Sequence, residues 1–182
     1  MHFRTAEISD IPGIVKLYKA VAKTPGGLAR LEHEITEDYV ANFLKKSLDN
    51  GLIIVGELES NPGDLIAEVH GYKPGLQCFS HVFGDVTFCV HPDHQGKGIG
   101  RTIFTIFLDE IANNRPDIGK VELYTGENNR KAIGLYQSLG FLIEGRMEMR
   151  FKTPGGSYEA DIPMGWVNPN FEFDGTIPRL ND

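Results

Sequence analysis

Apolar residues repeat along this chain at helical spacing in some stretches and at strand spacing in others. A first helix is predicted after Ser9-Asp10, because Pro12 lies in its first turn and an apolar stripe follows at Ile11, Ile14, Val15, Tyr18 and Val21. A second helix is predicted from Thr36, with acidic residues in its first turn, and Asp49-Asn-Gly51 ends it. Residues 24–27 break the first pattern, and the link 28–35 is interpreted as either an extra helical turn or a loop.

Strand-like segments surround these helices. A short first strand is predicted over 2–7, and three more are predicted over 52–58, 65–72 and 81–90. Turn-forming residues at 61–64 and 73–75 separate the last three. Because connections this short cannot cross over a sheet, the three strands are expected to form an antiparallel meander.

The second half of the chain alternates helix and strand. Apolar residues from Ile99 to Ile111 predict a helix that begins near Gly98 and ends at Asn113-Asn-Arg-Pro116. The next strand, 120–125, must run parallel to 86–90 because that helix crosses over between them. A short helix over 130–138 and a hairpin of strands 141–151 and 157–166, turning at Thr153-Pro-Gly-Gly156, complete the pattern.

The predicted order is β-α-α-β-β-β-α-β-α-β-β, which indicates a mixed α/β fold with helices flanking a mixed central sheet. We expect one domain over residues 1–182, with its core at about 3–166 and an irregular tail over 167–182. No internal repeat or low-complexity segment is seen in the sequence.

Composition narrows the partners and the location. The longest aliphatic run, 52–55, is too short to span a bilayer, and the first residues lack the apolar segment of a secretory signal. A cytoplasmic location without a membrane partner is therefore expected. The net charge of −7 argues against nucleic-acid binding and is compatible with a cationic amine as substrate.

Three glycines, at 96, 98 and 100, lie where a polar loop leads from strand 86–90 into a helix. Such a turn exposes backbone N–H groups at the positive end of a helix, and it binds phosphate or pyrophosphate readily. The dinucleotide spacing G-x-G-x-x-G fails because position 101 is Arg, and the Walker spacing fails because position 91 is His. The pattern that remains is Gln95-x-x-Gly98-x-Gly100.

This pattern resembles the Q/R-x-x-G-x-G/A motif of the GNAT superfamily of N-acetyltransferases, which holds the pyrophosphate of acetyl-CoA. A second segment resembles the later motif of the superfamily, N-x-x-A-x-x-L-Y-x-x-x-G-F, and reads Asn129-x-x-Ala132-Ile-x-Leu135-Tyr136-x-x-Leu139-Gly140-Phe141. The predicted element order over about 3–166 is also that of the GNAT fold. The resemblance implies acetyl-CoA as cosubstrate and no metal. Homodimers are common in the superfamily, so a homodimer is a possible assembly.

The resemblance also implies a set of site residues. Asn129 is expected to contact the pantetheine arm, and Tyr136 is expected near the thioester sulfur. A neutral phenol there can protonate a departing thiolate, so Tyr136 is the candidate general acid. Backbone groups of the strand before the loop are expected to pair with pantetheine, and one N–H to polarise the thioester carbonyl. The cofactor-binding residues so implied are Phe88, Cys89, Val90, Gln95, Gly96, Lys97, Gly98, Ile99, Gly100, Arg101, Asn129 and Tyr136.

The general base is less well marked. Some relatives carry Glu at the position of Gly84, where this chain has no carboxylate. Asp85 is adjacent, but strand alternation turns its side chain to the other face unless a β-bulge intervenes. We name Asp85 and Glu68 as candidate bases, and the alternatives are His81, His33 and Glu34.

A zinc site is a further possibility, because Cys78, His81, Cys89, His91 and His94 are residue types that could ligate zinc. Their spacing matches no standard zinc motif, so no metal is expected, and Cys89 is not expected to act as a nucleophile.

The favoured function is acetyl transfer from acetyl-CoA to a primary amine by direct attack. Glu144-Gly-Arg146 and Tyr158-x-x-Asp161-x-x-Met164 resemble the branch that acts on small amines, amino-acid derivatives or protein N-termini. The alternative is a non-catalytic acyl-CoA sensor on the same fold.

Overall fold

The computed structural model describes residues 1–24, 27–153 and 155–172, and it has the predicted mixed α/β architecture. Its main elements are β1 (His2–Thr5), α1 (Ile11–Ala22), α2 (Glu37–Asn50), β2 (Gly51–Leu58), β3 (Asn61–Tyr72), β4 (Val82–Val90), α3 (Ile99–Asn114), β5 (Lys120–Gly126), α4 (Arg130–Ser138), β6 (Leu142–Ile143), β7 (Met147–Lys152) and β8 (Tyr158–Val167).

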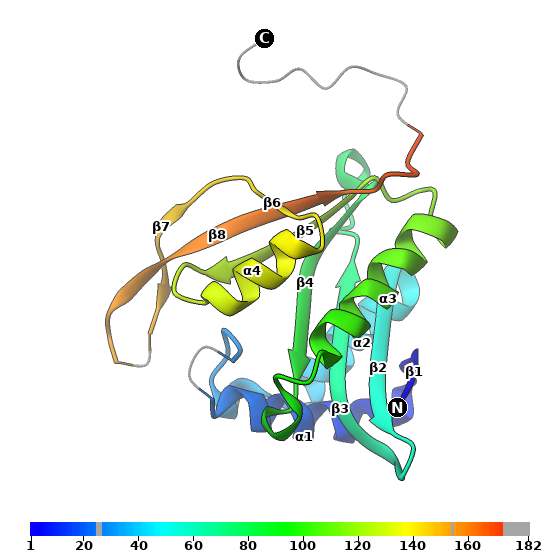
Figure 1. Cartoon of the computed structure of the whole chain (residues 1–182), viewed down its shortest axis with the longest axis vertical. Coiled ribbons are helices and arrows are strands. Elements are labelled where there is room, and N and C mark those ends of the chain that lie inside the picture. Colours follow the sequence, from blue (N-terminus) through cyan, green and yellow to red (C-terminus); the bar gives the residue numbers. More distant parts are fainter. Residues whose placement is uncertain (25–26, 154, 173–182) are drawn as a thin grey trace.

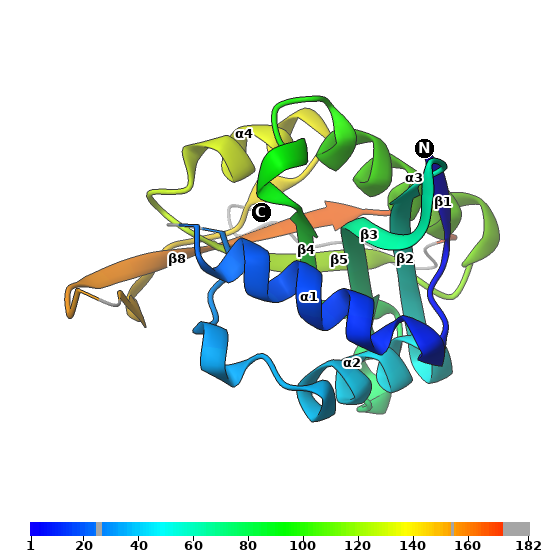
Figure 2. The same cartoon turned by 90° about the horizontal axis from the view of Figure 1, so that it is seen from below.

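These strands form one sheet in the order β1-β2-β3-β4-β5-β8-β6, and β7 pairs with the far part of β8. The β2-β3-β4 meander is antiparallel, and β5 is parallel to β4, as the sequence predicts. Helices α1 and α2 cover one face of the sheet, and α3 and α4 cover the other (Figure 1, Figure 2). Two apolar cores follow from this layering, one beneath α1 and α2 around Tyr18 and Phe43, and one beneath α3 and α4 around Phe104 and Phe107.

The helix boundaries agree closely with the sequence because local capping groups set them. Thr36 Oγ1 accepts a hydrogen bond from the Tyr39 amide at the start of α2, and Asn129 Oδ1 accepts one from the Ala132 amide at the start of α4. Gly98 caps α3 with a φ of +82°. The predicted break at 24–27 includes residues 25–26, which lie outside the described residues.

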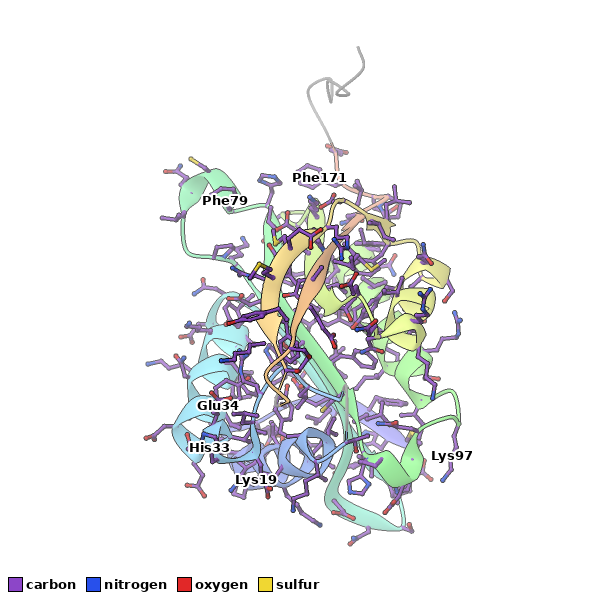
Figure 3. The ribbon with its side chains drawn as sticks, turned by 90° about the vertical axis from the view of Figure 1, so that its left-hand side faces the viewer. Lys19, His33, Glu34, Phe79, Lys97 and Phe171 are labelled. Carbon is purple, nitrogen blue, oxygen red and sulfur yellow. The ribbon has the colours of Figure 1, made fainter. Side chains whose placement is uncertain are left out.

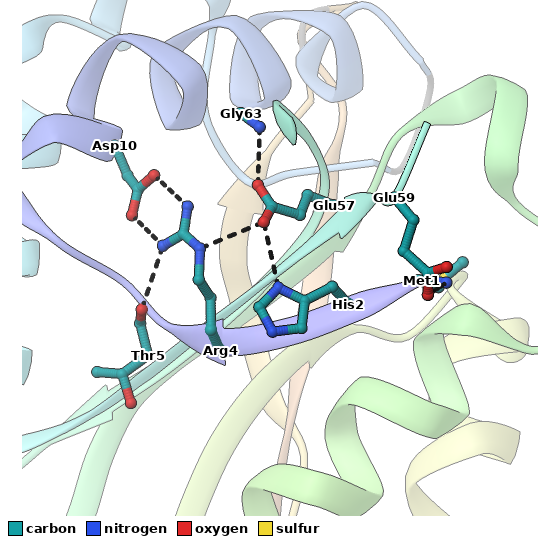
Figure 4. A network of polar contacts seen from close by, with 8 residues as sticks. All are labelled: Met1, His2, Arg4, Thr5, Asp10, Glu57, Glu59 and Gly63. Carbon is teal, nitrogen blue, oxygen red and sulfur yellow. Dashed lines mark hydrogen bonds and ion pairs between the residues drawn. The ribbon is translucent and has the colours of Figure 1, made fainter. Parts of the chain in front are cut away.

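A polar network ties β1 to the start of α1 and to the β2–β3 hairpin (Figure 4). Arg4 binds the Asp10 carboxylate through two nitrogens at 2.7 and 2.8 Å, and its Nε lies 3.5 Å from Glu57 Oε1. The Gly63 amide donates to Glu57 Oε2 at 2.8 Å. The hydrogen bond from Arg4 is the largest cause of the lowered pKa of Asp10. Charge-assisted hydrogen bonds therefore hold the edge strand β1 to the start of α1.

Two strand predictions need correction. The predicted strand 141–151 is divided into β6 and β7, and Met149 within β7 has a φ of +53°, because four residues of β7 span two of β8. The β2–β3 turn lies at residues 59–60, two residues before the predicted turn formers begin. The closing turn includes residue 154, and the predicted tail includes residues 173–182, both outside the described residues.

Strands β4 and β5 stay paired over only two positions. Val82 pairs with Lys120 and Phe83 with Val121, after which the two strands diverge (Figure 1). Beyond that point β4 continues along β3 to Val90, while β5 continues along β8 to Gly126. We call this place, where residues 84–90 of β4 lose their partner, the β4–β5 split.

Candidate active site

The glycine loop is shaped by backbone conformation rather than by crowding. Gly96 and Gly98 have φ values of +73° and +82°, and a Cβ built on either meets no atom within 4 Å. Glycine is favoured at both positions because side chains strain this left-handed conformation. Gly100 differs, since its Cβ would lie 3.2 Å from the Phe88 ring. The loop therefore leaves its backbone uncovered.

Uncovered amides follow from this shape. The first hydrogen bond of α3 runs from the Thr102 amide to the Gly98 carbonyl, at 3.0 Å. In the described part of the chain the amides from Gly96 to Arg101 make no backbone hydrogen bond. They lie at the positive end of a long helix, where an anionic group is stabilised.

Side chains of the loop fix it to its surroundings. Gln95 Nε2 donates to the Val90 carbonyl at 2.9 Å, which ties the loop to the end of β4. Lys97 Nζ donates to the Asp93 carbonyl at 2.8 Å, and Arg101 Nη2 donates to Ser138 Oγ of α4 at 2.8 Å. Both cations are exposed, so the loop region presents positive charge to solvent.

Successive residues of β4 direct their backbone N–H and C=O groups alternately toward β3 and toward the split. The His91 amide donates to the Ile66 carbonyl at 2.8 Å, and the register pairs Cys89 with Glu68. Because hydrogen-bonded pairs alternate along an antiparallel ladder, Cys89 also uses its backbone groups toward β3. Phe88 and Val90 then direct their amides toward the split.

Tyr136 of α4 lies at the split, with its ring packed edge-on against Phe88 at 6.1 Å and Phe104 at 5.5 Å. The side chain is buried, and burial raises its pKa well above the ordinary tyrosine value. Its hydroxyl makes no hydrogen bond within the described chain. Among the described residues, the fully buried side-chain polar atom without a partner is Ser47 Oγ, so the Tyr136 hydroxyl retains some access to solvent. The hydroxyl is therefore free to meet a ligand.

A β-bulge in β4 brings Asp85 to the same side of the sheet as Tyr72. The register slips between His70 and Tyr72, Tyr72 pairs with Gly84, and Asp85 has a φ of +52°. The side chain of Asp85 is exposed and interacts with the Tyr72 hydroxyl. Burial first, and then this carboxylate, raise the pKa of Tyr72 to about 12.

Glu68 lies in a sealed polar cluster beneath α1. Tyr18 donates to its Oε2 at 2.5 Å, and His70 Nδ1 lies 2.8 Å from its Oε1. Its exposure is 0%, so no amine in solvent reaches it directly. Burial, and then Glu68, raise the pKa of the Cys89 thiol well above its usual value, which disfavours a thiolate there.

The other candidate bases are dispersed. His33 and Glu34 belong to a single helical turn, Glu32–Glu34, and Figure 3 shows them near Lys19, apart from Lys97 of the glycine loop. His81 packs against Phe171, and Figure 3 places Phe171 at the opposite end of the molecule from Lys97. Of the two named candidate bases, Asp85 follows the last residues of β4 that pair with β5, and Glu68 pairs with Cys89 further along β4.

The suggested zinc ligands do not converge. Cys78 is exposed on a short turn, whereas Cys89 is buried on β4. Within residues 1–24, 27–153 and 155–172, no group of three or more His, Cys, Asp or Glu side chains is arranged to hold a metal ion. Among the described helices, none has the length and apolar character needed to cross a membrane.

Residues 17–141 match the model of the acetyltransferase (GNAT) family. The chain belongs to the GNAT family. It is 42% identical over 149 residues to the L-amino acid N-acyltransferase MnaT of Escherichia coli, which covers 81% of this chain and 83% of that protein. Two solved structures share the fold: YncA of Salmonella typhimurium with acetyl-CoA (TM-score 0.79, 21% identity, 99% and 98% of the two chains) and a phosphinothricin acetyltransferase of Sinorhizobium meliloti with acetyl-CoA (TM-score 0.81, 18% identity, 98% and 93%).

This GNAT chain is accordingly an N-acetyltransferase that uses acetyl-CoA. Its residues fit that cosubstrate. Within the described residues, the amides of the glycine loop make no backbone hydrogen bond and two cations lie beside them, the amides of Phe88 and Val90 face the split, and the Tyr136 hydroxyl there makes no hydrogen bond. The sequence motifs missed the aromatic and polar residues on the opposite face, Tyr18, His70 and Tyr72, because none belongs to a recognisable spacing.

Proposed function

We propose that this GNAT enzyme transfers the acetyl group of acetyl-CoA to the primary amine of a small molecule, an amino-acid derivative or a peptide, by direct attack. The name of MnaT, an L-amino acid N-acyltransferase at 42% identity, supports an amino acid or a derivative among these acceptors. The observation that carries the proposal is the Tyr136 hydroxyl at the β4–β5 split, which makes no hydrogen bond within the described residues.

In this proposal, backbone amides bind the cosubstrate more than side chains do. The amides of Gly96–Arg101 bind the pyrophosphate, and Lys97 and Arg101 add positive charge beside it. The amides of Phe88 and Val90 pair with the pantetheine arm, and Asn129 borders that path at the start of α4. The ladder alternation favours Phe88 and Val90 over Cys89 for this role.

Acetyl-CoA supplies a thioester carbonyl that an amine can attack and a thiol that can leave. The attacking nitrogen must lose a proton, and Asp85 is the exposed carboxylate at the split that can accept it. The departing sulfur needs a proton, and Tyr136 Oη can donate one. Because burial raises the pKa of Tyr136, its hydroxyl stays protonated at neutral pH. Glu68 is fully buried and bonded to Tyr18 and His70, so we do not propose it as the group that takes the proton directly.

The test combines the release of CoA with a panel of amines and the binding of acetyl-CoA by calorimetry. We expect Tyr136→Phe to lower kcat by about a hundredfold or more, since general acid catalysis commonly contributes that much. The dissociation constant for acetyl-CoA should change by less than about threefold, because the ring contacts remain. Wild-type protein that binds acetyl-CoA but acetylates no amine would instead be a sensor, and an unchanged rate in Tyr136→Phe removes that residue from its role.

A further inference from the structure

The two halves of the sheet meet over a short stretch, where residues 81–83 lie beside residues 119–121, and we call this place the joint. β4 and β5 pair there at two positions, and beyond them the split opens. The His81 carbonyl accepts hydrogen bonds from the amides of Gly119 and Lys120, at 2.8 and 3.1 Å. Because so few backbone contacts join the two strands, the position of Gly119 helps to fix the direction in which β5 leaves β4.

The segment that follows β8 binds this joint. Asn168 is 2% exposed, its Nδ2 donates to the Ile118 carbonyl at 2.7 Å, and its amide donates to the Gly119 carbonyl at 2.9 Å. The Phe171 ring lies directly on Gly119, since a Cβ built on this glycine would lie 2.9 Å from the ring. The same ring packs against His81, with 6.4 Å between the ring centres. We call Asn168 and Phe171 the joint clasp, because together they contact both strands of the joint.

The clasp is itself held in a turn. Asn168 Oδ1 accepts a hydrogen bond from the Asn170 amide at 3.0 Å, and the Asn168 carbonyl accepts one from the Phe171 amide at 3.2 Å. Since Asn168 is almost sealed from solvent, a lost hydrogen bond leaves a buried polar group without its partner, which is unfavourable. The turn therefore keeps the Phe171 ring over the joint.

A small rotation at the joint becomes a large displacement along the split. A strand rises about 3.3 Å per residue, so Phe88 lies about 17 Å along β4 from Phe83, and a rotation of about 5° at Phe83 moves Phe88 by about 1.5 Å. Because β4 is paired with β3 and β5 with β8, such a rotation moves each half of the sheet as a unit. A displacement of about 1 Å between reacting groups can lower a rate by about a hundredfold. The angle at the joint therefore matters for catalysis at the other end of β4.

We propose that the joint clasp is a positioning device for acetyl-CoA: Asn168 and Phe171 fix the angle between β4 and β5, and so keep the split at the width that the pantetheine arm needs. This inference rests on the proposed path of that arm along the amides of Phe88 and Val90. The clasp acts from a distance, since Figure 3 places Phe171 at the opposite end of the molecule from Lys97 of the glycine loop. Neither sequence motif includes a clasp residue.

The test compares Asn168→Ala and Phe171→Ala with the control Asn170→Ala. Asn170 belongs to the same segment, and its Nδ2 donates to the Ala112 carbonyl of α3 at 3.0 Å, so the control loses the same kind of hydrogen bond away from the joint. Phe171 is only partly buried, so Phe171→Ala should fold even where Asn168→Ala does not. Phe171→Leu keeps an apolar contact on Gly119 and serves as the rescue variant. Every variant is studied at a temperature where circular dichroism shows it to be folded.

Two measurements are made on each protein: steady-state kinetics with acetyl-CoA and an amine acceptor, and amide hydrogen exchange at single-residue resolution with and without saturating acetyl-CoA. In the wild type, acetyl-CoA should protect the amides of Gly96–Arg101 and those of Phe88 and Val90. In the two clasp variants the loop amides should stay protected, whereas Phe88 and Val90 should lose most of their protection and kcat should fall by about 10- to 100-fold.

The control Asn170→Ala should match the wild type, and Phe171→Leu should recover part of the loss. Unchanged kcat together with unchanged protection of Phe88 and Val90 in a folded clasp variant overturns the inference. Equal loss of protection at the glycine loop and at β4 also overturns it, because that pattern marks a general loosening of the fold. If acetyl-CoA binds the wild type without protecting Phe88 and Val90, the proposed path of the pantetheine arm fails, and the inference fails with it.

Discussion

A single buried carboxylate organises the polar chemistry beneath α1. Glu68 has no exposed surface, and an unpartnered charge or acid in that position is strongly unfavourable. Both of its oxygens are occupied, one by the Tyr18 hydroxyl and one by His70. The sequence offers Glu68 as a candidate base, but its burial depends on Tyr18, 50 residues away, a contact that no local pattern reveals.

Removing the Tyr18 hydroxyl should therefore reduce stability. Tyr18→Phe leaves Glu68 Oε2 without its donor in an apolar core, and we expect a loss of about 1–3 kcal/mol in the free energy of unfolding. Urea denaturation monitored by circular dichroism measures it. The matched control is Tyr158→Phe, since Tyr158 is exposed and should tolerate the change within about 0.5 kcal/mol. Equal stability of the two variants contradicts this role of Tyr18.

At Asp85, the role of the carboxylate as a proton acceptor can be tested separately from the role of the residue in the β-bulge. Its φ of +52° is a conformation that asparagine also adopts readily, so Asp85→Asn should keep the bulge. We expect kcat to fall by about a hundredfold or more, with the affinity for acetyl-CoA nearly unchanged, because only the proton acceptor is lost. Steady-state kinetics and calorimetry check both quantities. Asp109→Asn, on the exposed side of α3, is the control, and full activity in Asp85→Asn excludes Asp85 as the base.

At the scale of elements, the sequence predicts helices better than strands. Thr36, Gly98 and Asn129 cap their helices locally, so the starts of α2, α3 and α4 can be read directly from the sequence. The bulge at Asp85 and the division of β6 from β7 depend on register with strands distant in the chain. Strand alternation predicts the face of a side chain only until such a slip occurs. The helix starts that carry the two motifs are consequently easier to predict than the strand geometry around Asp85.

The glycine loop and α4 offer a paired test of backbone conformation. Gly98→Ala places a side chain at a φ of +82°, and we expect it to lower stability by about 1–2 kcal/mol and to weaken acetyl-CoA binding. Gly134 lies inside α4, and a Cβ there meets nothing within 4 Å. Gly134→Ala should therefore raise stability by about 0.4–1 kcal/mol. Thermal and urea unfolding measure both, and the same sign of change in the two variants contradicts the argument.

At the scale of the whole molecule, the sheet is two sheets joined at one short parallel contact. The β1–β4 half is packed against α1 and α2, and the β5–β8 half carries α4, while β4 and β5 pair only at Val82 and Phe83. A sequence motif marks each side of the split, on the loop before α3 and on α4. The fold brings the two motifs together at the split, although they are separated in the sequence.

Four tyrosines from these layers, Tyr18, Tyr39, Tyr72 and Tyr136, have raised pKa values, with burial as the largest cause in each. In the unfolded chain they ionise near pH 10, whereas the folded protein keeps them protonated to higher pH, to about 12 for Tyr72. The folded state therefore binds more protons, and stability must fall as pH rises above about 9. Each protonated tyrosine contributes a slope of about 1.4 kcal/mol per pH unit.

Urea unfolding between about pH 8 and 11, together with the absorbance of tyrosinate, checks this expectation. The variant Tyr18→Phe/Tyr136→Phe should lose stability less steeply with pH, because two of the buried phenols that resist ionisation are gone. Its stability at neutral pH is lower than that of the wild type, so the comparison is of slopes and not of absolute values. A variant slope equal to that of the wild type means that these two hydroxyls ionise as easily in the folded protein as in the unfolded chain. Tyr136 then loses the property that keeps it a proton donor at neutral pH, because the raised pKa that holds its proton would be absent.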